Sequence, residues 1–99
     1  MIKSKKYRDA AKGQPCTLNI AGVCNYDPET TVFCHFPDES HGMGKKSDDI
    51  SGGDGCSDCH DWIDGRTGSH HSVDTDFYMR RSQTRTLRNR IERGIVKFA

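Results

Sequence analysis

The sequence predicts a small α+β domain held together by a bound metal, and three observations support this. Leu, Ile, Val and Phe number only 16 among the 99 residues, below the roughly 20% that a chain needs to fold around an apolar core alone. Five cysteines offer metal ligands, and their odd number argues against a fully paired disulfide framework. Short strand patterns and helical patterns both occur along the chain, so both kinds of element are expected.

The first half of the chain is expected to form one short helix and two strands. The helix runs from Lys5 to Lys12 and ends at a glycine and a proline. Residues 16–20 alternate as a short strand, and residues 30–36 form the strongest strand pattern. Residues 37–55 are rich in Gly, Asp and Ser, so they are predicted to form a long surface loop, a kind of segment that often carries function.

Two helices are predicted in the second half. The first begins at Cys56 or Ser57 and runs through Ile63, with Trp62 expected to pack the helix onto a strand rather than to stack on a base. A loop follows at 66–72. Asp74 is the expected N-cap of the closing helix, whose apolar positions recur at helical spacings and are predicted to face the core: Phe77, Thr84, Leu87, Ile91 and Ile95.

Charge divides the chain into zones although the net charge is only +1. Residues 1–12 carry a net +4 and residues 80–99 a net +6, around an acidic middle of −9. This division favours a phosphate-binding protein with a cation site, and the alternative is a merely solvated surface. We expect a basic segment (1–12), a core (13–72) and a basic amphipathic helix (73–99) within one domain. The candidate phosphate contacts are Lys45, Lys46, Arg81, Arg85 and Arg88.

No membrane contact is expected. No apolar stretch approaches the ~18 residues of a membrane span, and residues 1–12 are too polar for a secretory signal. The sequence therefore predicts a soluble protein of the cytoplasm, where thiols stay reduced and metal binding is the first expectation for the cysteines.

Four of the cysteines are predicted to bind one structural zinc. Cys56 and Cys59 form a CxxC at the start of a helix, and Cys16 and Cys24 form a second pair. A redox-active CxxC is the alternative, but the βαβ pattern of such proteins is missing. Cys34 is expected to be a small buried hydrophobe, although it could replace Cys24 as a ligand.

Several short motifs in one order resemble a known nuclease class. His35 on a strand, a Gly-rich loop and then Cys56-Ser57-Asp58-Cys59-His60 is the order of parts in the HNH (ββα-metal, His-Me finger) nucleases, which have a treble-clef scaffold. More narrowly, residues 16–66 resemble the YbcO-like family of small predicted nucleases from lambdoid phages and prophages. The shared motifs are GVCN, PET, the His-bearing strand, GxGxK and CSxCHDxIDxR.

The resemblance implies a catalytic site with two histidines. His35 matches the general base, and His60 matches a ligand of a catalytic divalent cation (Mg²⁺, Mn²⁺, Ni²⁺ or Zn²⁺), with Asp64 as a second ligand one turn later. Two departures from the class stand out. Cys34 occupies the place of a customary hard ligand, and the middle Asn of the signature has no clear counterpart, Asp48 or Asp49 being nearest in order.

The expected function is hydrolysis of DNA phosphodiester bonds by a phage- or prophage-encoded endonuclease inside a bacterial host. The sequence leaves open RNA as the substrate and a homodimer as the acting unit. The alternative is a zinc-stabilised module that binds nucleic acid or protein and catalyses no reaction. The two departures from the HNH class, at Cys34 and at the middle Asn, favour this alternative.

Overall fold

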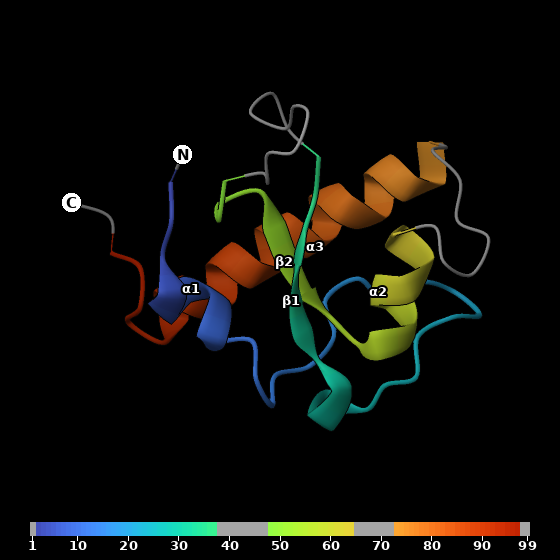
Figure 1. Cartoon of the computed structure of the whole chain (residues 1–99), viewed down its shortest axis with the longest axis horizontal. Coiled ribbons are helices and arrows are strands. Elements are labelled where there is room, and N and C mark those ends of the chain that lie inside the picture. Colours follow the sequence, from blue (N-terminus) through green and yellow to red (C-terminus); the bar gives the residue numbers. More distant parts are fainter. Residues whose placement is uncertain (1, 38–47, 65–72, 98–99) are drawn as a thin grey trace.

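Two short antiparallel strands form the centre of the molecule. The computed structural model describes residues 2–37, 48–64 and 73–97, and in it β1 (Val32–His35) pairs with β2 (Gly52–Gly55). Helices α1 (Lys5–Asp9) and α2 (Ser57–Ile63) lie on opposite sides of this ribbon, and the long helix α3 (Val73–Glu92) crosses behind it (Figure 1). A single 3-10 turn, η1 (Pro28–Thr30), leads into β1.

The strand β2 corrects the prediction of an unbroken loop over residues 37–55. Its sequence is Gly-Gly-Asp-Gly, which has low strand propensity, yet all four residues are buried. A Cβ on Gly53 would collide with Ser82 of α3, and one on Gly55 would meet the side chains of Leu18 and Cys34. The missing side chains therefore let α3 and the segment around Leu18 approach the strand backbone.

The first predicted strand, residues 16–20, is wrong, and the second is shorter than expected. Residues 16–20 form an irregular turn in which Asn19 has a φ of 43°, in the left-handed region. One backbone hydrogen bond, from Thr17 N–H to the Asp54 carbonyl at 2.8 Å, joins this turn to β2. The turn also brings the backbone N–H of Asn19 to 3.4 Å from the sulfur of Cys16.

The helices form where the sequence predicts them, with adjusted ends. α1 begins after Ser4, whose hydroxyl accepts the N–H of Tyr7, and it ends before Lys12. α2 has Cys56 as its N-cap, with the sulfur accepting the N–H of Cys59. α3 begins at Val73, so Asp74 lies within its first turn rather than at the cap.

The buried face of α3 is polar, which contradicts the prediction that its apolar stripe faces the core. Phe77 is 56% exposed and Leu87 is 37% exposed. At about 100° per residue, the buried positions lie on the opposite side of the helix from this stripe. The fully or nearly fully buried residues of α3 are Thr75, Ser82, Thr86 and Arg90.

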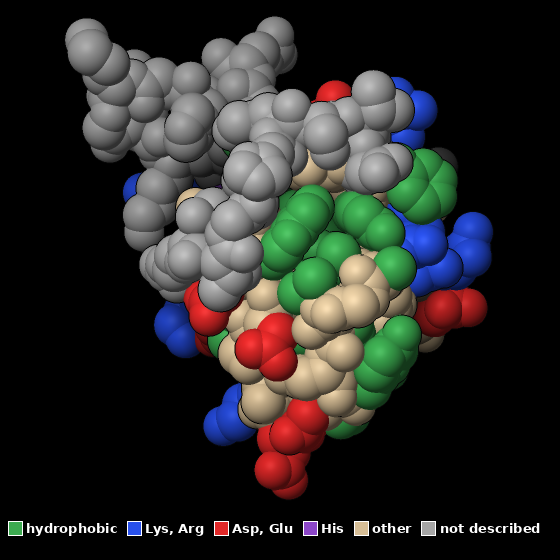
Figure 2. Space-filling view, turned by 90° about the vertical axis from the view of Figure 1, so that its right-hand side faces the viewer, with side chains coloured by type: hydrophobic (Ala, Val, Ile, Leu, Met, Phe, Trp, Pro, Cys, Tyr) green, Lys and Arg blue, Asp and Glu red, His purple; other side chains and the backbone are tan. Residues whose placement is uncertain are grey.

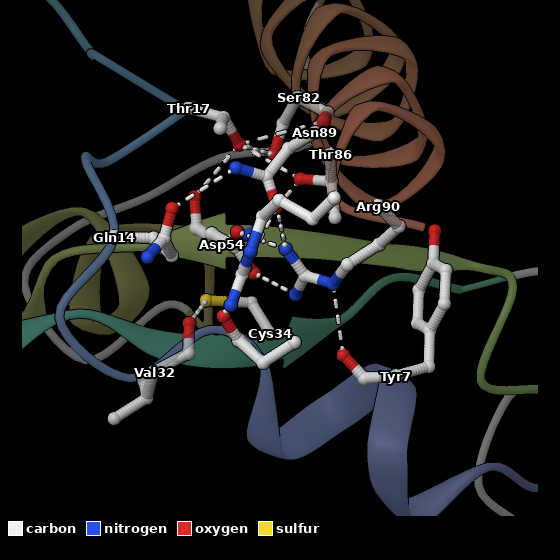
Figure 3. A network of polar contacts seen from close by, with 12 residues as sticks. Tyr7, Gln14, Thr17, Val32, Cys34, Asp54, Ser82, Thr86, Asn89 and Arg90 are labelled. Atoms are coloured by element: carbon white, nitrogen blue, oxygen red, sulfur yellow. Dashed lines mark hydrogen bonds and ion pairs between the residues drawn. The ribbon is translucent and has the colours of Figure 1, made fainter. Parts of the chain in front are cut away.

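A buried ion pair ties α3 to β2 and α1 (Figure 3). Arg90 is fully buried, and its guanidinium donates to both oxygens of Asp54, at 2.6 and 2.8 Å. Arg90 Nε donates to the carbonyl of Tyr7, and the guanidinium lies 5.1 Å from the centre of the Tyr7 ring. Beside it, the hydroxyls of Thr17, Ser82 and Thr86 bond to one another and to β2.

The apolar core is small and rich in sulfur, as the composition predicts. Its buried members are Cys16, Leu18, Ile20, Cys34, Phe36, Cys56, Cys59 and Ile63. Half of these are cysteines, so the metal-ligand candidates form part of the core itself. None of the helices in the described residues combines the length and apolar character that crossing a bilayer requires.

Candidate metal centre and active site

Four cysteine sulfurs converge at one point between the turn after α1 and the start of α2. The sulfurs of Cys16, Cys24, Cys56 and Cys59 all lie within 4.8 Å of one another, and those of Cys24 and Cys56 are 3.9 Å apart. A zinc ion with four Zn–S bonds of about 2.3 Å needs sulfurs about 3.8 Å apart. The four thiols therefore fit a structural metal such as zinc, as the spacing of the two pairs predicts.

Backbone and side-chain N–H groups point at these sulfurs. Asn19 donates its backbone N–H to Cys16 and its side-chain amide to Cys24, and Asn25 donates its N–H to Cys56. A hydrogen bond from the Cys59 thiol, helped by the Asn19 N–H and opposed by burial, lowers the pKa of Cys16 to about 5. This favours the thiolate, the form that binds metal, at Cys16, whereas burial raises the pKa of Cys24 and the hydrogen bond to Cys16 raises that of Cys59.

Cys34 is not part of the cluster. Its side chain is fully buried, and its thiol lies 3.7 Å from the Val32 carbonyl. Burial raises the pKa of this thiol, with the Asp64 carboxylate adding to the effect. Among the described residues, the structure brings Cys24 and not Cys34 to the other three cysteines, so Cys34 is the buried hydrophobe that the sequence predicts.

Two arginines of α3 form hydrogen bonds to the turn that follows Cys16. Arg81 donates to the carbonyl of Leu18 at 2.7 Å, and Arg85 donates to the Asn19 side chain at 3.0 Å and the Thr17 carbonyl at 3.5 Å. Both guanidinium groups therefore have partners within the protein. Arg88, the third predicted phosphate contact, is exposed. Lys45 and Lys46 lie outside the described residues.

His35, the predicted general base, contacts a carboxylate. Its Nε2 lies 2.8 Å from Oδ1 of Asp49, whose side chain is only 5% exposed. The ring also packs edge-to-face on Phe33, with centroids 5.1 Å apart. Asp48, the other candidate for the middle position of the HNH signature, instead accepts the backbone N–H of Ile2. Order along the chain could not distinguish Asp48 from Asp49 as the middle residue of the signature. In the folded protein it is Asp49 that contacts His35.

The second oxygen of Asp49 binds the start of α1, which sequence reasoning did not include in the site. Oδ2 accepts the N–H of Ser4 and the guanidinium of Arg8, each at 2.6 Å. Burial opposes ionisation of Asp49, but the hydrogen bonds from His35, Ser4 and Arg8 outweigh it and lower its pKa. Asp49 is therefore a buried anion held at both oxygens. An isolated Arg8 in a basic segment gives no sequence signal of this role.

The other predicted pair lies on α2. His60 Nε2 is 3.1 Å from Asp64 Oδ2, one helical turn later, and both side chains are about 30% exposed. The partial exposure leaves both groups within reach of solvent. Trp62, between them in sequence, packs edge-to-face on Tyr78 of α3 and against the core that contains Cys34 of β1, so its indole joins α2 to α3 as well as to the core.

Strand alternation directs His35 to the face of the ribbon opposite the core beside α2. Cys34 and Phe36 pack with Cys59 and Ile63 in the core beside α2. His35 and Phe33 point the other way, where the Phe33 ring contacts Tyr7 of α1. The two imidazoles contact different carboxylates, His35 that of Asp49 and His60 that of Asp64.

The chain is a small α+β protein with a cluster of four cysteines that could hold a metal and with two histidine–carboxylate pairs. The chain belongs to the family described as "Putative nuclease YbcO", whose model matches residues 5–95. It is 44% identical over 71 residues to "Putative nuclease YbcO" of Escherichia coli (strain K12) and equally to "Putative nuclease ybcO" of Enterobacteria phage 82, covering 71% of each chain.

A solved structure has a similar fold. It is described as "Structure of a putative bacteriophage protein from Escherichia coli str. K-12 substr. MG1655". The TM-score is 0.66 at 34% identity, over 90% of this chain and all of the other. The family comparison thus confirms the narrower of the two resemblances found in the motifs, that to the YbcO-like family.

Proposed function

We propose that this protein is a metal-dependent endonuclease of the HNH type that hydrolyses phosphodiester bonds in DNA. The observation that carries the proposal is the contact of His35 with the doubly held carboxylate of Asp49. The similar proteins of Escherichia coli and Enterobacteria phage 82 are described as nucleases, which supports this proposal. The order β1, β2, α2 around a four-cysteine centre is also the order of parts in a treble-clef ββα-metal scaffold.

The His35–Asp49 contact suits general base catalysis. A neutral imidazole bonded through Nε2–H to a carboxylate keeps Nδ1 free to take a proton from water. Asp49 also stabilises the imidazolium that forms, and its own place is secured by Ser4 and Arg8. His35 would remove the proton of the water that attacks phosphorus.

His60 and Asp64 suit a divalent cation. Two ligand atoms at right angles on a cation, with bonds of about 2.1 Å, lie about 3 Å apart, close to the 3.1 Å that separates the two side-chain atoms. A bound cation would stabilise the negative charge that develops on the phosphoryl oxygens and on the departing 3′ oxygen. Within this arrangement, the scissile phosphate would lie over the end of β1, between the His35 face and the α2 face.

Arginines and lysines would hold the rest of the substrate. Arg88 is exposed on α3 and free to meet a phosphate, whereas Arg81 and Arg85 already bond to the turn around Leu18, so their contribution would be weaker. Lys45 and Lys46 follow β1 in the sequence and complete the proposed set.

Plasmid nicking tests the proposal. Zinc-loaded wild type is incubated with supercoiled plasmid and Mg²⁺, Mn²⁺, Ni²⁺ or Zn²⁺, beside His35→Ala and His60→Ala. We expect nicking by wild type with at least one cation, and a fall of about 100-fold or more in His35→Ala. Equal cutting by wild type and His35→Ala would contradict the catalytic assignment. Nicking by neither, with DNA binding retained, would instead support the non-catalytic binding module.

A further inference from the structure

The apolar stripe of α3 that was expected in the core lies beside a basic hollow. This hollow, of about 360 Å³, is called here the Phe77 hollow and is lined by Phe77, Arg80, Arg81, Thr84, Arg85 and Arg88. Its volume is within the range of small-ligand sites. The described residues that line it include four arginines and no carboxylate, so the hollow suits an anionic ligand.

An exposed aromatic ring borders the hollow. Phe77 is 56% exposed, and the guanidinium of Arg81 lies 5.2 Å from the ring centre. The Arg81 group is fixed by its bond to the Leu18 carbonyl. Arg81 therefore covers part of the Phe77 ring, and the exposed remainder of the ring is open to a flat ligand next to Arg80 and Arg88.

The two remaining arginines, Arg80 and Arg88, determine how far the Phe77 hollow extends along α3. Arg80 and Arg88 are exposed, and from Phe77 to Arg88 the helix extends about 16 Å. An open aromatic surface followed by arginines along a groove is the combination with which proteins bind single-stranded nucleic acid, bases stacking on rings and phosphates meeting cations. An acidic peptide would form ion pairs with the arginines, but its carboxylates would not stack on the exposed Phe77 ring.

The hollow also lies close to the proposed catalytic helix. Tyr78, the neighbour of Phe77, packs on Trp62 of α2, which is two residues from His60. Figure 2 shows Lys and Arg side chains gathered beside apolar ones at the right-hand edge of the face that carries α2 and the start of α3. A strand held in the hollow could therefore continue toward α2.

We infer that the Phe77 hollow binds an unpaired segment of DNA, with a base stacked on Phe77 and phosphates on Arg80 and Arg88. This inference rests on the proposed function, because it takes the bound strand to be part of the DNA substrate. It deepens that function, since the enzyme would prefer DNA with a single-stranded segment. In a duplex the bases are paired and stacked on each other, so no base would reach the Phe77 ring.

Fluorescence anisotropy of the full-length, zinc-loaded chain tests the inference, with no divalent cation added, so that no cleavage occurs. The probes are a labelled oligothymidylate and a labelled blunt-ended duplex that has no unpaired bases. We expect Phe77→Ala to weaken single-strand binding about tenfold and to leave duplex binding within about twofold. Leu87→Ala, an exposed apolar residue of the same helix outside the hollow, is the control and should change neither.

Two further measurements separate stacking from general loss of structure. Phe77→Trp should restore single-strand binding, and a 2-aminopurine base in the oligonucleotide should lose fluorescence on binding wild type but not Phe77→Ala. Arg80→Ala and Arg88→Ala should each reduce the magnitude of the salt slope for the single strand by about 0.7. Lys12→Ala, an exposed lysine outside the hollow, should leave that slope unchanged.

The inference is overturned if Phe77→Ala leaves single-strand binding unchanged or weakens single strand and duplex equally. Its failure is distinct from failure of the proposed function. Nicking that depends on His35 together with unchanged binding in Phe77→Ala would refute only the hollow. Loss of binding in Phe77→Ala without any nicking by wild type would refute only the enzyme.

Discussion

Nε2 of His35 lies 2.8 Å from Oδ1 of Asp49, and this contact joins the end of β1 to the turn that precedes β2. The other oxygen of Asp49 accepts the Ser4 N–H and the Arg8 guanidinium. A carboxylate with both oxygens occupied has little freedom to rotate, so it can fix the orientation of the imidazole. The basic segment at the start of the chain thereby becomes a support of the proposed catalytic group.

Replacement of this carboxylate should reduce activity far more than replacement of its neighbour. Asp49→Asn keeps the size of the side chain but loses the charge that stabilises an imidazolium, so we expect the nicking rate to fall about 100-fold or more. Asp48→Asn is the matched control, because Asp48 bonds to the Ile2 N–H and not to His35. Equal rates for the two variants would remove Asp49 from the mechanism.

Asp49 should also contribute to stability in a pH-dependent way. Its pKa is lowered in the folded protein, so its stabilising contribution is complete above the unfolded pKa of about 3.9 and is lost as pH falls through the lower, folded value. The free energy of unfolding of wild type should therefore exceed that of Asp49→Asn near pH 6, and the gap should narrow below about pH 4.

Urea unfolding of wild type and Asp49→Asn at a series of pH values measures this gap. Asp48→Asn again serves as the control. A gap between wild type and Asp49→Asn that stays constant down to pH 3 would contradict the ionic role of Asp49.

Removal of the metal should unfold the domain. The four cysteines that could hold a metal lie in or against a core that has few other apolar side chains, so we expect metal binding and folding to be coupled. Cys56→Ser, or a strong chelator added to wild type, should abolish the cooperative thermal transition seen by circular dichroism. Atomic absorption should find about one zinc per chain in wild type.

Cys34→Ala is the matched control for the metal site. Cys34 is as buried as Cys56 but lies outside the sulfur cluster. Its truncation should cost about 1 to 2 kcal/mol through lost packing and leave the zinc content unchanged. Loss of zinc in Cys34→Ala would show that the ligand set is wrong.

Breaking the buried ion pair should be strongly destabilising. Arg90→Met leaves the carboxylate of Asp54 buried without its bidentate partner, which should lower the free energy of unfolding by about 3 to 5 kcal/mol. Arg88→Met, on the exposed side of the same helix, should change it by about 0.5 kcal/mol at most.

A double variant checks the cause of that loss. In Asp54→Asn with Arg90→Met neither partner of the pair is charged, so the double variant should be more stable than Arg90→Met alone. Additive losses in the two single variants would mean that the pair contributes packing rather than charge balance.

Local chemistry made part of this protein predictable. The cysteine pairs could be assigned because a ligand spacing is a property of neighbouring residues, and α2 follows from the CxxC that caps it. The strand β1 and the helix α3 are also visible as patterns, since each depends mainly on its own run of residues.

Long-range packing decided the rest. β2 consists of glycines and one aspartate because α3 must approach its backbone, and no propensity scale registers side chains that need to be absent. α3 buries hydroxyls and Arg90 against that strand, so its hydrophobic periodicity indicated the outer face instead of the inner one. Only contact in three dimensions selects Asp49 over Asp48, because adjacent residues of one type differ solely in what they meet when the chain folds.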